Sequence, residues 1–373
     1  MSVKIVKVTA KSDLKKFIKF PYELYKGCEN WVPALIGDEY DTFNPKKNAA
    51  FEFCKAECYL AYKDGKLVGR TAAIINEKAN ELWKKDDVRF GWTDFIEDQE
   101  VLDALLAAVA DYGRKNGCES MVGPWGFTDM DKEGALTEGF EYLSPFTCLY
   151  NYPYYDRMFA AAGLEKDVDW LQKMVKLDGE MPQIYNFAST IEERYGLHVV
   201  QAKSVNELCR KYGLDIFRMY NEAFAPLSHF CPLTDRQIKD YLDTYVPILD
   251  KRFTAVCVNA DDEPIGFTFC VPTLSKAVKK SGGRLFPFGI FRILHALKHN
   301  DTLEALLIGV KPEYQSKGAA LLMLKYLHEN CKEAGVTTML MNPQLEENIK
   351  VQTLFDAYEQ KVFQRRRAYK IDL

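Results

Sequence analysis

The residues with the clearest capacity for ligand binding lie at 309–320, in the order Gly-Val-Lys-Pro-Glu-Tyr-Gln-Ser-Lys-Gly-Ala-Ala. An apolar run of strand length, 303–308, precedes them, and leucines at helical spacing follow from Leu321. Gly318 stands at the expected start of the helix, where a residue without a Cβ lets the backbone approach a ligand closely. The first N–H groups of a helix lack internal partners and lie at the positive end of its dipole. The segment therefore predicts a phosphate-binding loop.

The pattern Val-x-Pro-x-Tyr-Gln-x-x-Gly-x-Ala at 310–320, in its strand–loop–helix context, resembles motif A of the GNAT acetyltransferases. An ordinary strand-to-helix turn is the alternative interpretation. The resemblance implies that the loop amides hold the pyrophosphate of acetyl-CoA or another acyl-CoA. The cofactor-binding residues that it implies are Ile308, Val310, Gln315, Ser316, Lys317, Gly318, Ala319, Ala320, Asn348 and Phe355.

Acyl transfer to an amine needs a group that takes up a proton. An amine with a pKa near 10.4 lies about 4.6 kcal/mol from its neutral form at pH 7. Glu304 stands on the strand that enters the loop, and the resemblance implies that such a glutamate is the catalytic base. The alternative is a strand residue that faces solvent. The resemblance also implies that the backbone N–H of Val310 binds the thioester carbonyl, which requires no specialised side chain.

The family pattern Asn-x-x-Ala-x-x-Leu-Tyr appears at 348–355 as Asn-Ile-Lys-Val-Gln-Thr-Leu-Phe. Phe355 therefore replaces the tyrosine that the family uses as an acid. We expect Asn348 to bind the pantetheine arm or to cap its own helix. Tyr358 is the candidate for an acid near the sulfur, and a packed aromatic ring is the alternative.

Length and composition restrict the class of protein. With 373 residues, 47% of them hydrophobic, the chain can bury the cores of two domains. A formal net charge of −4 provides no general field for nucleic acid. No apolar run reaches the roughly 18 residues of a membrane span and no leader segment is evident, so we expect a cytoplasmic protein without stable membrane insertion. The ten cysteines are scattered singly, which predicts reduced thiols and no metal site.

The chain has two copies of one layout. Each copy begins with a short strand that leads into a helix, with Ser12 and Ser204 as candidate helix caps. A hairpin follows, turning at Asp64-Gly65 in the first copy and at 261–264 in the second. This parallel order predicts a tandem repeat.

The copies also end alike, with a strand, a helix, another strand, a helix led by Asn151 or Asn348, and a final strand. A break at 178–182 and a helix ending at Gly196 separate them. We therefore expect a first domain at 1–180, a linker helix at 181–196 and a second domain at 197–373.

This order is what the GNAT fold implies. It is an α/β (α+β) architecture of two tandem domains, each with a mixed, mostly antiparallel central sheet flanked by helices. The tandem arrangement looks like that of N-myristoyltransferases, Fem-type aminoacyl transferases and mycothiol synthase. In the first half, Glu97, Asp98 and Glu100 occupy the place of the phosphate loop, where three carboxylates would repel a pyrophosphate. We expect the first domain to be degenerate and the second to bind acyl-CoA.

Three other segments keep two interpretations each. The acidic and aromatic residues of 129–155 could receive an ammonium group or form a seam between domains. The basic and apolar residues of 275–300 predict packing or a dimer contact, or else contact with an acyl chain or lipid. Arg365, Arg366 and Arg367 favour a solvated strand edge over a grip on the cofactor's ribose phosphate.

These observations predict an acyl-CoA-dependent N-acyltransferase, foremost an acetyltransferase, that acts by direct attack of the amine in a ternary complex. The acceptor is expected to be a small-molecule or peptidic amine, and a homodimer is possible. The alternative is a catalytically inactive acyl-CoA-binding or regulatory protein, which the absence of the family tyrosine permits. A scaffold without any ligand is a third interpretation.

Overall fold

The computed structural model describes residues 2–373, which form two compact units. Unit 1 contains the chain up to Leu171 together with Ser275–Arg292 and Phe363–Leu373, and unit 2 contains Gln172–Leu274 and Ile293–Val362. The elements that carry the chain from one unit to the other are β7 (Glu165–Lys176), α10 (Gly289–Lys298) and β14 (Gln360–Asp372). These units differ from the division expected at 181–196, because the final strand and the segment before α10 pack with the first part of the chain.

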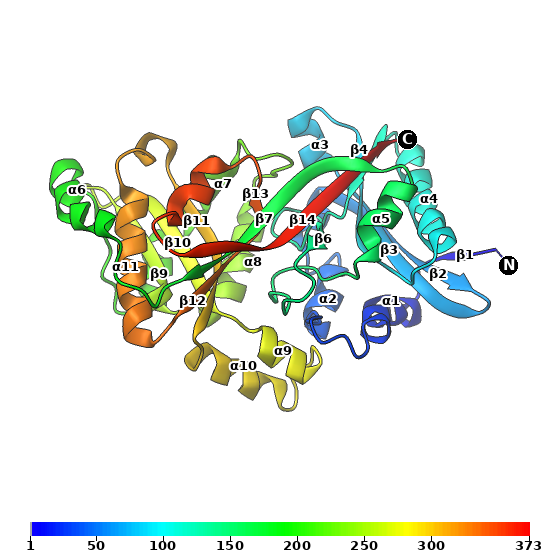
Figure 1. The fold of residues 1–373 in the computed structure, drawn as a ribbon. Coiled ribbons are helices and arrows are strands. Elements are labelled where there is room, and N and C mark those ends of the chain that lie inside the picture. The colour runs from blue at the N-terminus through cyan, green and yellow to red at the C-terminus, as the bar shows by residue number, and fades with distance from the viewer. Residues whose placement is uncertain (1) are drawn as a thin grey trace. The chain divides into compact units, whose positions relative to one another are not determined.

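Unit 1 is built around a sheet of strand order β1-β2-β3-β4-β5-β14, in which only β4 and β5 run parallel. Figure 1 shows its elements mainly in blue and cyan. They are β1 (Lys4–Lys7), α1 (Lys11–Leu24), α2 (Ile36–Thr42), β2 (Cys54–Lys63), β3 (Lys66–Asn76), α3 (Glu77–Trp83), β4 (Asp87–Phe95), α4 (Gln99–Lys115), β5 (Ser120–Gly123), β6 (Ala135–Glu138), α5 (Tyr154–Ala161) and α9 (Ser275–Ser281).

Helices cover both faces of the unit 1 sheet, as the alternation along β3 requires. Ala73 and Ile75 belong to the cluster that contains the buried face of α4. Their neighbours Ala72 and Ile74 pack in a second cluster with Phe17 of α1. A strand buried on both sides loses the polar alternation of a surface strand, which explains the apolar run in β3.

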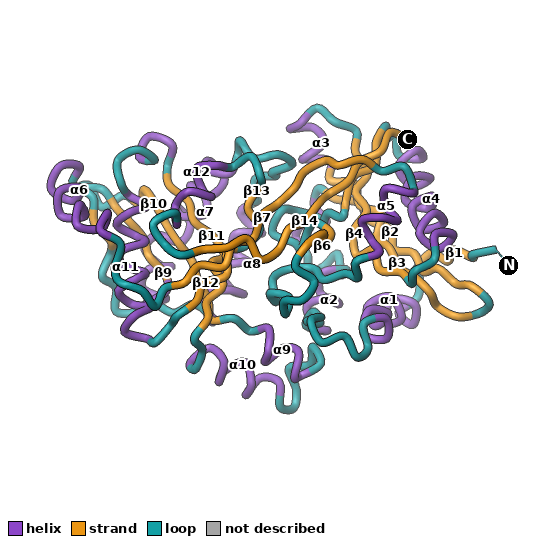
Figure 2. The backbone as a smooth tube through the Cα atoms, in the orientation of Figure 1, coloured by secondary structure: helices purple, strands orange, loops and turns teal. Residues whose placement is uncertain are grey.

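Unit 2 repeats this plan with strand order β7-β12-β11-β10-β9-β8, in which only β11 and β12 run parallel. Figure 2 distinguishes its strands from its helices by colour. Its elements are α6 (Ala188–Tyr195), β8 (His198–Val199), α7 (Val205–Phe224), α8 (Asp235–Tyr245), β9 (Thr254–Val258), β10 (Pro264–Pro272), β11 (Thr302–Val310), α11 (Ala319–Ala334), β12 (Thr338–Met341), β13 (Gln344–Leu345) and α12 (Ile349–Gln352). Helix α11 packs on β9 and β10, while α7 packs on β10 and β11.

One strand in each unit is irregular at the same place in the layout. The register of β4 with β3 shifts between Arg70 and Ala72, and β11 is out of register with β10 at Leu306. Parallel pairing of β4 with β5 ends at Arg89, and that of β11 with β12 ends at Ala305. Each strand therefore leaves its parallel neighbour before it ends. Such bulges re-aim the backbone and are common beside functional sites.

The structure confirms the predicted sheet class, both hairpins and several local features. Ser204 caps α7, because its side chain accepts a hydrogen bond from the Glu207 N–H at 3.2 Å. The expected linker helix is present as a 3₁₀ turn, Gln183–Phe187, followed by α6 and ended by Gly196 in a left-handed conformation.

Two predicted helix starts are wrong, the cap at Ser12 and the helix led by Asn151. Ser12 lies within α1, whose cap residue is Ala10. Asn151 does not begin α5, whose cap residue is Pro153. Its side chain instead bonds the backbone N–H and carbonyl of Leu136, so the asparagine fastens a loop rather than a helix end.

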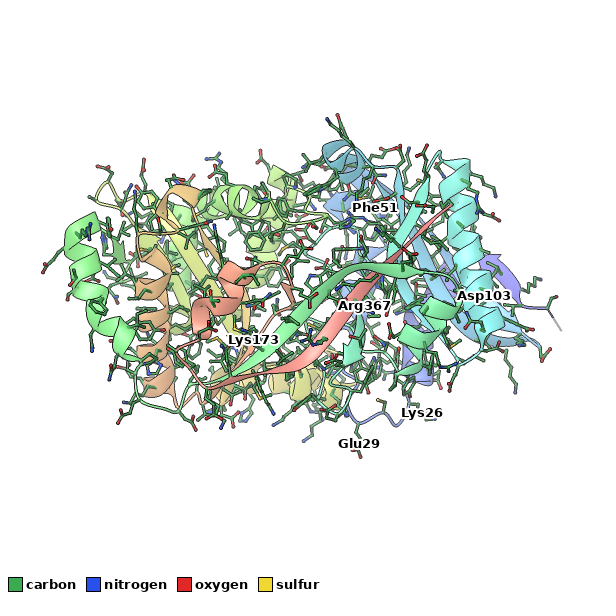
Figure 3. The ribbon with its side chains drawn as sticks, turned by 45° about the horizontal axis from the view of Figure 1, so that its top comes forward. Lys26, Glu29, Phe51, Asp103, Lys173 and Arg367 are labelled. Atoms are coloured by element: carbon green, nitrogen blue, oxygen red, sulfur yellow. The ribbon has the colours of Figure 1, made fainter. Side chains whose placement is uncertain are left out.

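The prediction of a solvated edge is wrong for Arg366 and Arg367, which are engaged within unit 1, whereas the Arg365 side chain is 36% exposed and pairs with Glu138. Arg366 is fully buried and donates to the Leu149 carbonyl at 2.6 Å. Arg367, labelled in Figure 3, holds Asp169 through two hydrogen bonds of 2.7 and 3.0 Å. The reason is that β14 is not an edge strand, since it lies between β5 and β7 in the strand order.

The helix of unit 1 that corresponds to the phosphate-binding helix begins with its own carboxylate. Asp98 caps α4 by accepting from the Glu100 N–H at 3.1 Å. Lys63 forms ion pairs with Asp98 and Glu100 at 2.5 and 2.8 Å, and its hydrogen bond holds the pKa of Asp98 below its usual value. This helix end is thus already occupied by an anion from the chain.

We expect Asp98→Ala to destabilise unit 1 by about 1–2 kcal/mol, because α4 loses its cap and Lys63 loses a partner. The difference from the wild type should vanish as the pH falls through the lowered pKa of Asp98, since protonation removes the same interactions. Hydrogen exchange of the α4 amides at neutral and acid pH measures both effects. Asp111→Ala, near the other end of α4, is the control, and an equal loss in the two variants would contradict the capping role.

Candidate functional site

The loop between β11 and α11 has the geometry of an open helix start. After the 3₁₀ turn Pro312–Tyr314 the chain reaches Gly318, which caps α11 with φ +84°. A non-glycine residue is strained in this left-handed region. No side chain of residues 2–373 caps this helix, in contrast to α4, which Asp98 caps.

The first backbone N–H groups of α11 have no hydrogen-bond acceptor among residues 2–373. The first bond into the helix joins the Leu322 N–H to the Gly318 carbonyl at 3.2 Å. Across residues 2–373, no protein acceptor is found for the N–H groups of Gly318, Ala319, Ala320 and Leu321. Four such groups at the positive end of a 16-residue helix form a site suited to phosphate oxygens.

Helix α6 supports this loop from behind, and Figure 1 shows it beside the orange α11. A Cβ built on Gly318 would lie 2.6 Å from the side chain of Ile191 on α6. The close approach of Ile191 fixes the loop and explains why residue 318 must be glycine. A substitution there would change packing and charge together.

The strand that enters the loop exposes backbone groups on one side. The Lys311 N–H bonds the Ile265 carbonyl at 2.9 Å, which fixes the alternation of hydrogen bonds between β11 and β10. By that alternation, the N–H groups of Ile308 and Val310 point away from β10. They face the side that β12 has left after Ala305.

Asn342 makes hydrogen bonds to β11 at the point where β12 parts from it. Its backbone N–H donates to the Ala305 carbonyl at 3.2 Å, and its side-chain amide donates to the Leu306 carbonyl at 3.2 Å. These bonds pair the last groups before the strands part. Sequence reasoning missed Asn342, which carries no motif signal.

Helix α12 brings a second basic residue to the loop. Lys350 donates to the side-chain carbonyl of Gln315 at 3.2 Å, while the Lys317 ammonium lies 4.3 Å from the centre of the Tyr314 ring. Two cations beside open amides reinforce an anion site. Sequence reasoning did not select Lys350, although it stands two residues after Asn348.

The position of α12 is fixed at both ends. The Asn348 side chain accepts from the Val351 N–H at 3.4 Å, so the helix-cap alternative for this asparagine is the one the structure shows. At the other end, Lys173 of β7, labelled in Figure 3, donates to the Gln352 carbonyl at 2.7 Å. A lysine at a helix C-terminus also complements the dipole.

Glu304 is fully buried in the unit 2 sheet. Its backbone is paired with Val271 of β10 and Leu340 of β12, and its carboxylate accepts a hydrogen bond from the Thr273 hydroxyl. The alternative of a solvent-facing strand residue is therefore wrong. Burying a carboxylate is costly unless hydrogen bonds hold it, so Glu304 is an unusual residue for a purely structural position. Its role as a base stays a prediction.

Phe355 and Tyr358 lie in the apolar cluster beneath α11. Phe355 is 4% exposed. The Tyr358 hydroxyl lies 2.9 Å from that of Tyr185 and 3.1 Å from Nδ1 of His328. Burial raises the pKa of Tyr358 far above its ordinary value. Both rings pack in the core of unit 2. The predicted roles of Phe355 in cofactor binding and of Tyr358 as an acid stay predictions, and the observed contacts do not support them.

Comparison with known proteins identifies the architecture. No protein-family model matches the chain. A tandem GNAT protein from the clavulanic acid biosynthesis pathway matches this chain with a TM-score of 0.57 and 12% identity. The match covers 100% of this chain and 98% of that protein. A second match is the solved structure of a GCN5-related glucosamine N-acetyltransferase region in a fungal multi-domain GH3 β-N-acetylglucosaminidase, with a TM-score of 0.56 and 12% identity. This match covers 99% of this chain and 38% of that chain. The chain has the tandem GNAT fold.

Two curated bacterial proteins resemble this tandem GNAT chain in sequence. Protein YghO of Escherichia coli is 26% identical over 372 residues, covering 96% of this chain and 93% of its own. The bacterial ceramide synthase of Caulobacter vibrioides is 24% identical over 320 residues, covering 84% of this chain and 81% of its own.

The GNAT fold brings most of the predicted cofactor residues together in unit 2. Ile308 and Val310 end the strand, 315–320 form the loop and helix start, and Lys350 bonds the loop from α12. Glu304 lies upstream on the same strand. The predicted residues 304–320 thus lie on one continuous strand–loop–helix segment, while Phe355 and Tyr358 belong to the apolar core.

We expect Ser316→Asp to weaken binding of free coenzyme A by roughly 10- to 100-fold, because it places a carboxylate beside the open amides. Ser316 is exposed, so the fold should not change. Isothermal titration calorimetry measures the affinity. The matched control is Ser12→Asp on α1 of unit 1, and unchanged affinity in Ser316→Asp would contradict the location of the site.

The buried His328 predicts a pH dependence of unit 2 stability. Burial lowers the pKa of His328, so the folded state keeps the imidazole neutral while the unfolded state binds a proton below about pH 6.5. The free energy of unfolding should therefore fall on acidification below this pH. Denaturation at pH 7 and pH 5 should show a smaller fall in His328→Gln than in the wild type. The exposed His295→Gln serves as the control and should behave like the wild type.

Proposed function

We propose that this protein is an N-acyltransferase that moves an acyl group from acyl-CoA to an amine. The observation that carries the proposal is the set of open amides at the start of α11, which directly follows the freed edge of β11. A pyrophosphate site and a carbonyl site thus lie on one continuous segment. The name of the Caulobacter relative, a ceramide synthase, denotes formation of an amide-linked lipid and supports transfer to an amine.

Coenzyme A supplies an activated acyl group as a thioester. The N–H groups of 318–321 bind the pyrophosphate and orient the thioester, with Lys317 and Lys350 adding positive charge. The N–H groups of Ile308 and Val310 donate to the thioester oxygen and stabilise the negative charge that develops on it during attack.

The proton of the attacking amine is taken up by Glu304, which the Thr273 hydroxyl holds in place. The departing thiolate has a reference pKa near 8.5, so it leaves without a strong acid. This accounts for transfer in a chain whose family tyrosine is replaced by Phe355. The reaction is direct attack within a ternary complex.

The second candidate is an acyl-CoA-binding protein without turnover, which Phe355 and the packed Tyr358 favour. Thermal shifts with acetyl-, octanoyl- and palmitoyl-CoA test binding, and release of free coenzyme A with a panel of amines tests transfer. Binding with no release for any amine would assign the protein to the second class. The absence of any shift would contradict both.

We expect Glu304→Gln to lower kcat by at least about 100-fold at pH 7 while the Kd for acyl-CoA stays unchanged, because the amide keeps the side-chain volume but accepts no proton. The loss should diminish as the pH approaches the pKa of the acceptor amine. Steady-state kinetics across pH, with calorimetry for the Kd, separates the two effects. Glu313→Gln, an exposed change beside the loop, is the matched control. Equal kcat in Glu304→Gln and the wild type would exclude the base.

A further inference from the structure

The segment 275–300, which we call the basic aromatic segment, has a charge unlike the rest of the chain. It contains no aspartate or glutamate, although the whole chain has a formal net charge of −4. Its basic side chains are Lys276, Lys279, Lys280, Arg284, Arg292 and Lys298. None of them forms an ion pair with a carboxylate of residues 2–373.

The same segment exposes large apolar side chains. Phe286, Phe288 and Phe291 are 77%, 68% and 67% exposed, and Leu294 is 48% exposed. Phe288, Phe291 and Leu294 follow at intervals of three residues, so they lie along one side of the turn into α10. Ile293, on another side of α10, is buried at 6% exposure. Isolated exposed apolar residues need no explanation, but a contiguous group rimmed by charge marks an interaction site.

The segment is held firmly at its base in unit 1. The Gly283 carbonyl accepts from the Ile36 N–H at 2.9 Å, and a Cβ on Gly283 would lie 2.3 Å from the Ala34 carbonyl. Lys279 donates to the Glu29 carbonyl, and Arg292 donates to the Lys280 carbonyl at 2.8 Å. The exposed rings therefore project from an ordered base, whose α9 appears in yellow in Figure 1.

We propose that the basic aromatic segment docks the protein on the surface of an anionic phospholipid bilayer. Exposed phenylalanines beside lysines and arginines match the two parts of such a surface, the acyl boundary and the negative headgroups. No helix among residues 2–373 has the length and apolar character needed to cross a membrane. The contact is thus one that lies on the bilayer.

A second copy of the chain fits this face less well. In a symmetric dimer each subunit presents the same patch to the other. Two basic aromatic segments would then face each other with twelve cationic side chains and no carboxylate of their own. Like charges brought together in an interface oppose association. An anionic bilayer supplies the opposite charge.

Vesicle sedimentation tests the proposal without any acyl donor, so its result is independent of the proposed transfer activity. The wild type should bind phosphatidylglycerol-containing vesicles more tightly than pure phosphatidylcholine vesicles, and about 0.5 M salt should weaken that binding several-fold. Phe286→Ala/Phe288→Ala/Phe291→Ala should lower the partition coefficient at least about tenfold. Lys276→Glu/Lys280→Glu/Arg284→Glu should remove the preference for anionic vesicles.

Matched variants control for a general loss of apolar surface or charge. Leu82→Ala/Phe187→Ala/Leu214→Ala removes three other exposed apolar side chains, and Lys84→Glu/Lys85→Glu/Lys115→Glu makes the same charge change elsewhere in unit 1. Both should bind vesicles like the wild type. Added vesicles should also protect the amides of 284–298 from hydrogen exchange, which localises the contact.

Three results would overturn the proposal. The first is equal sedimentation of the wild type and the triple alanine variant with anionic vesicles. The second is a wild-type dimer that dissociates in the triple alanine variant during analytical ultracentrifugation, because it would assign the face to a second copy. The third is protection from exchange elsewhere with none at 284–298.

Discussion

The proposed site depends on the uncapped backbone N–H groups at the start of α11, and the equivalent helix start in unit 1 differs in this respect. Helix α4 of unit 1 and helix α11 of unit 2 occupy equivalent places in the repeated layout, yet α4 is closed by the Asp98 carboxylate while α11 begins at Gly318 with free amides. Four unpaired N–H groups are costly to bury and favourable to present to an anion. The structure leaves them without a side-chain cap, because the helix begins at Gly318, against which Ile191 packs closely. One half of the repeat has thus kept an anion site that the other half fills with its own side chain.

The backbone of β11 extends this site toward the reacting carbonyl. The irregularity at Leu306 and the departure of β12 after Ala305 free the outward N–H groups of Ile308 and Val310. Unit 1 has the same irregularity in β4 and the same early end of parallel pairing. The parting of the strands is therefore a property of the layout, while ligand binding depends on what the following helix start provides. This separates the roles of fold and sequence in the two units.

Sequence patterns predicted what depends on local backbone chemistry. The hairpins, the Ser204 cap, the sheet class and the strand–loop–helix at 303–334 follow from turn residues, capping residues and hydrophobic period. What depends on partners distant in the chain could not be predicted. From the sequence alone Arg366 is expected to be exposed, because the sequence does not show that β14 lies between β5 and β7. From the sequence alone Tyr358 is a candidate acid, because the sequence does not show that its hydroxyl lies within hydrogen-bond distance of Tyr185 and His328.

The same distant pairing explains why the compact units do not follow the repeat. Pairing of β14 with β5 runs from Tyr369 opposite Gly123 to Asp372 opposite Ser120, so the last strand of the chain completes the unit 1 sheet. A fragment that ends near residue 180 would lack this strand and the segment Ser275–Arg292. It would leave β5 with an unpaired edge, which favours aggregation. The repeat visible in the sequence therefore differs from the compact units, and the unit 1 sheet includes a strand that follows the proposed site of unit 2 in the chain.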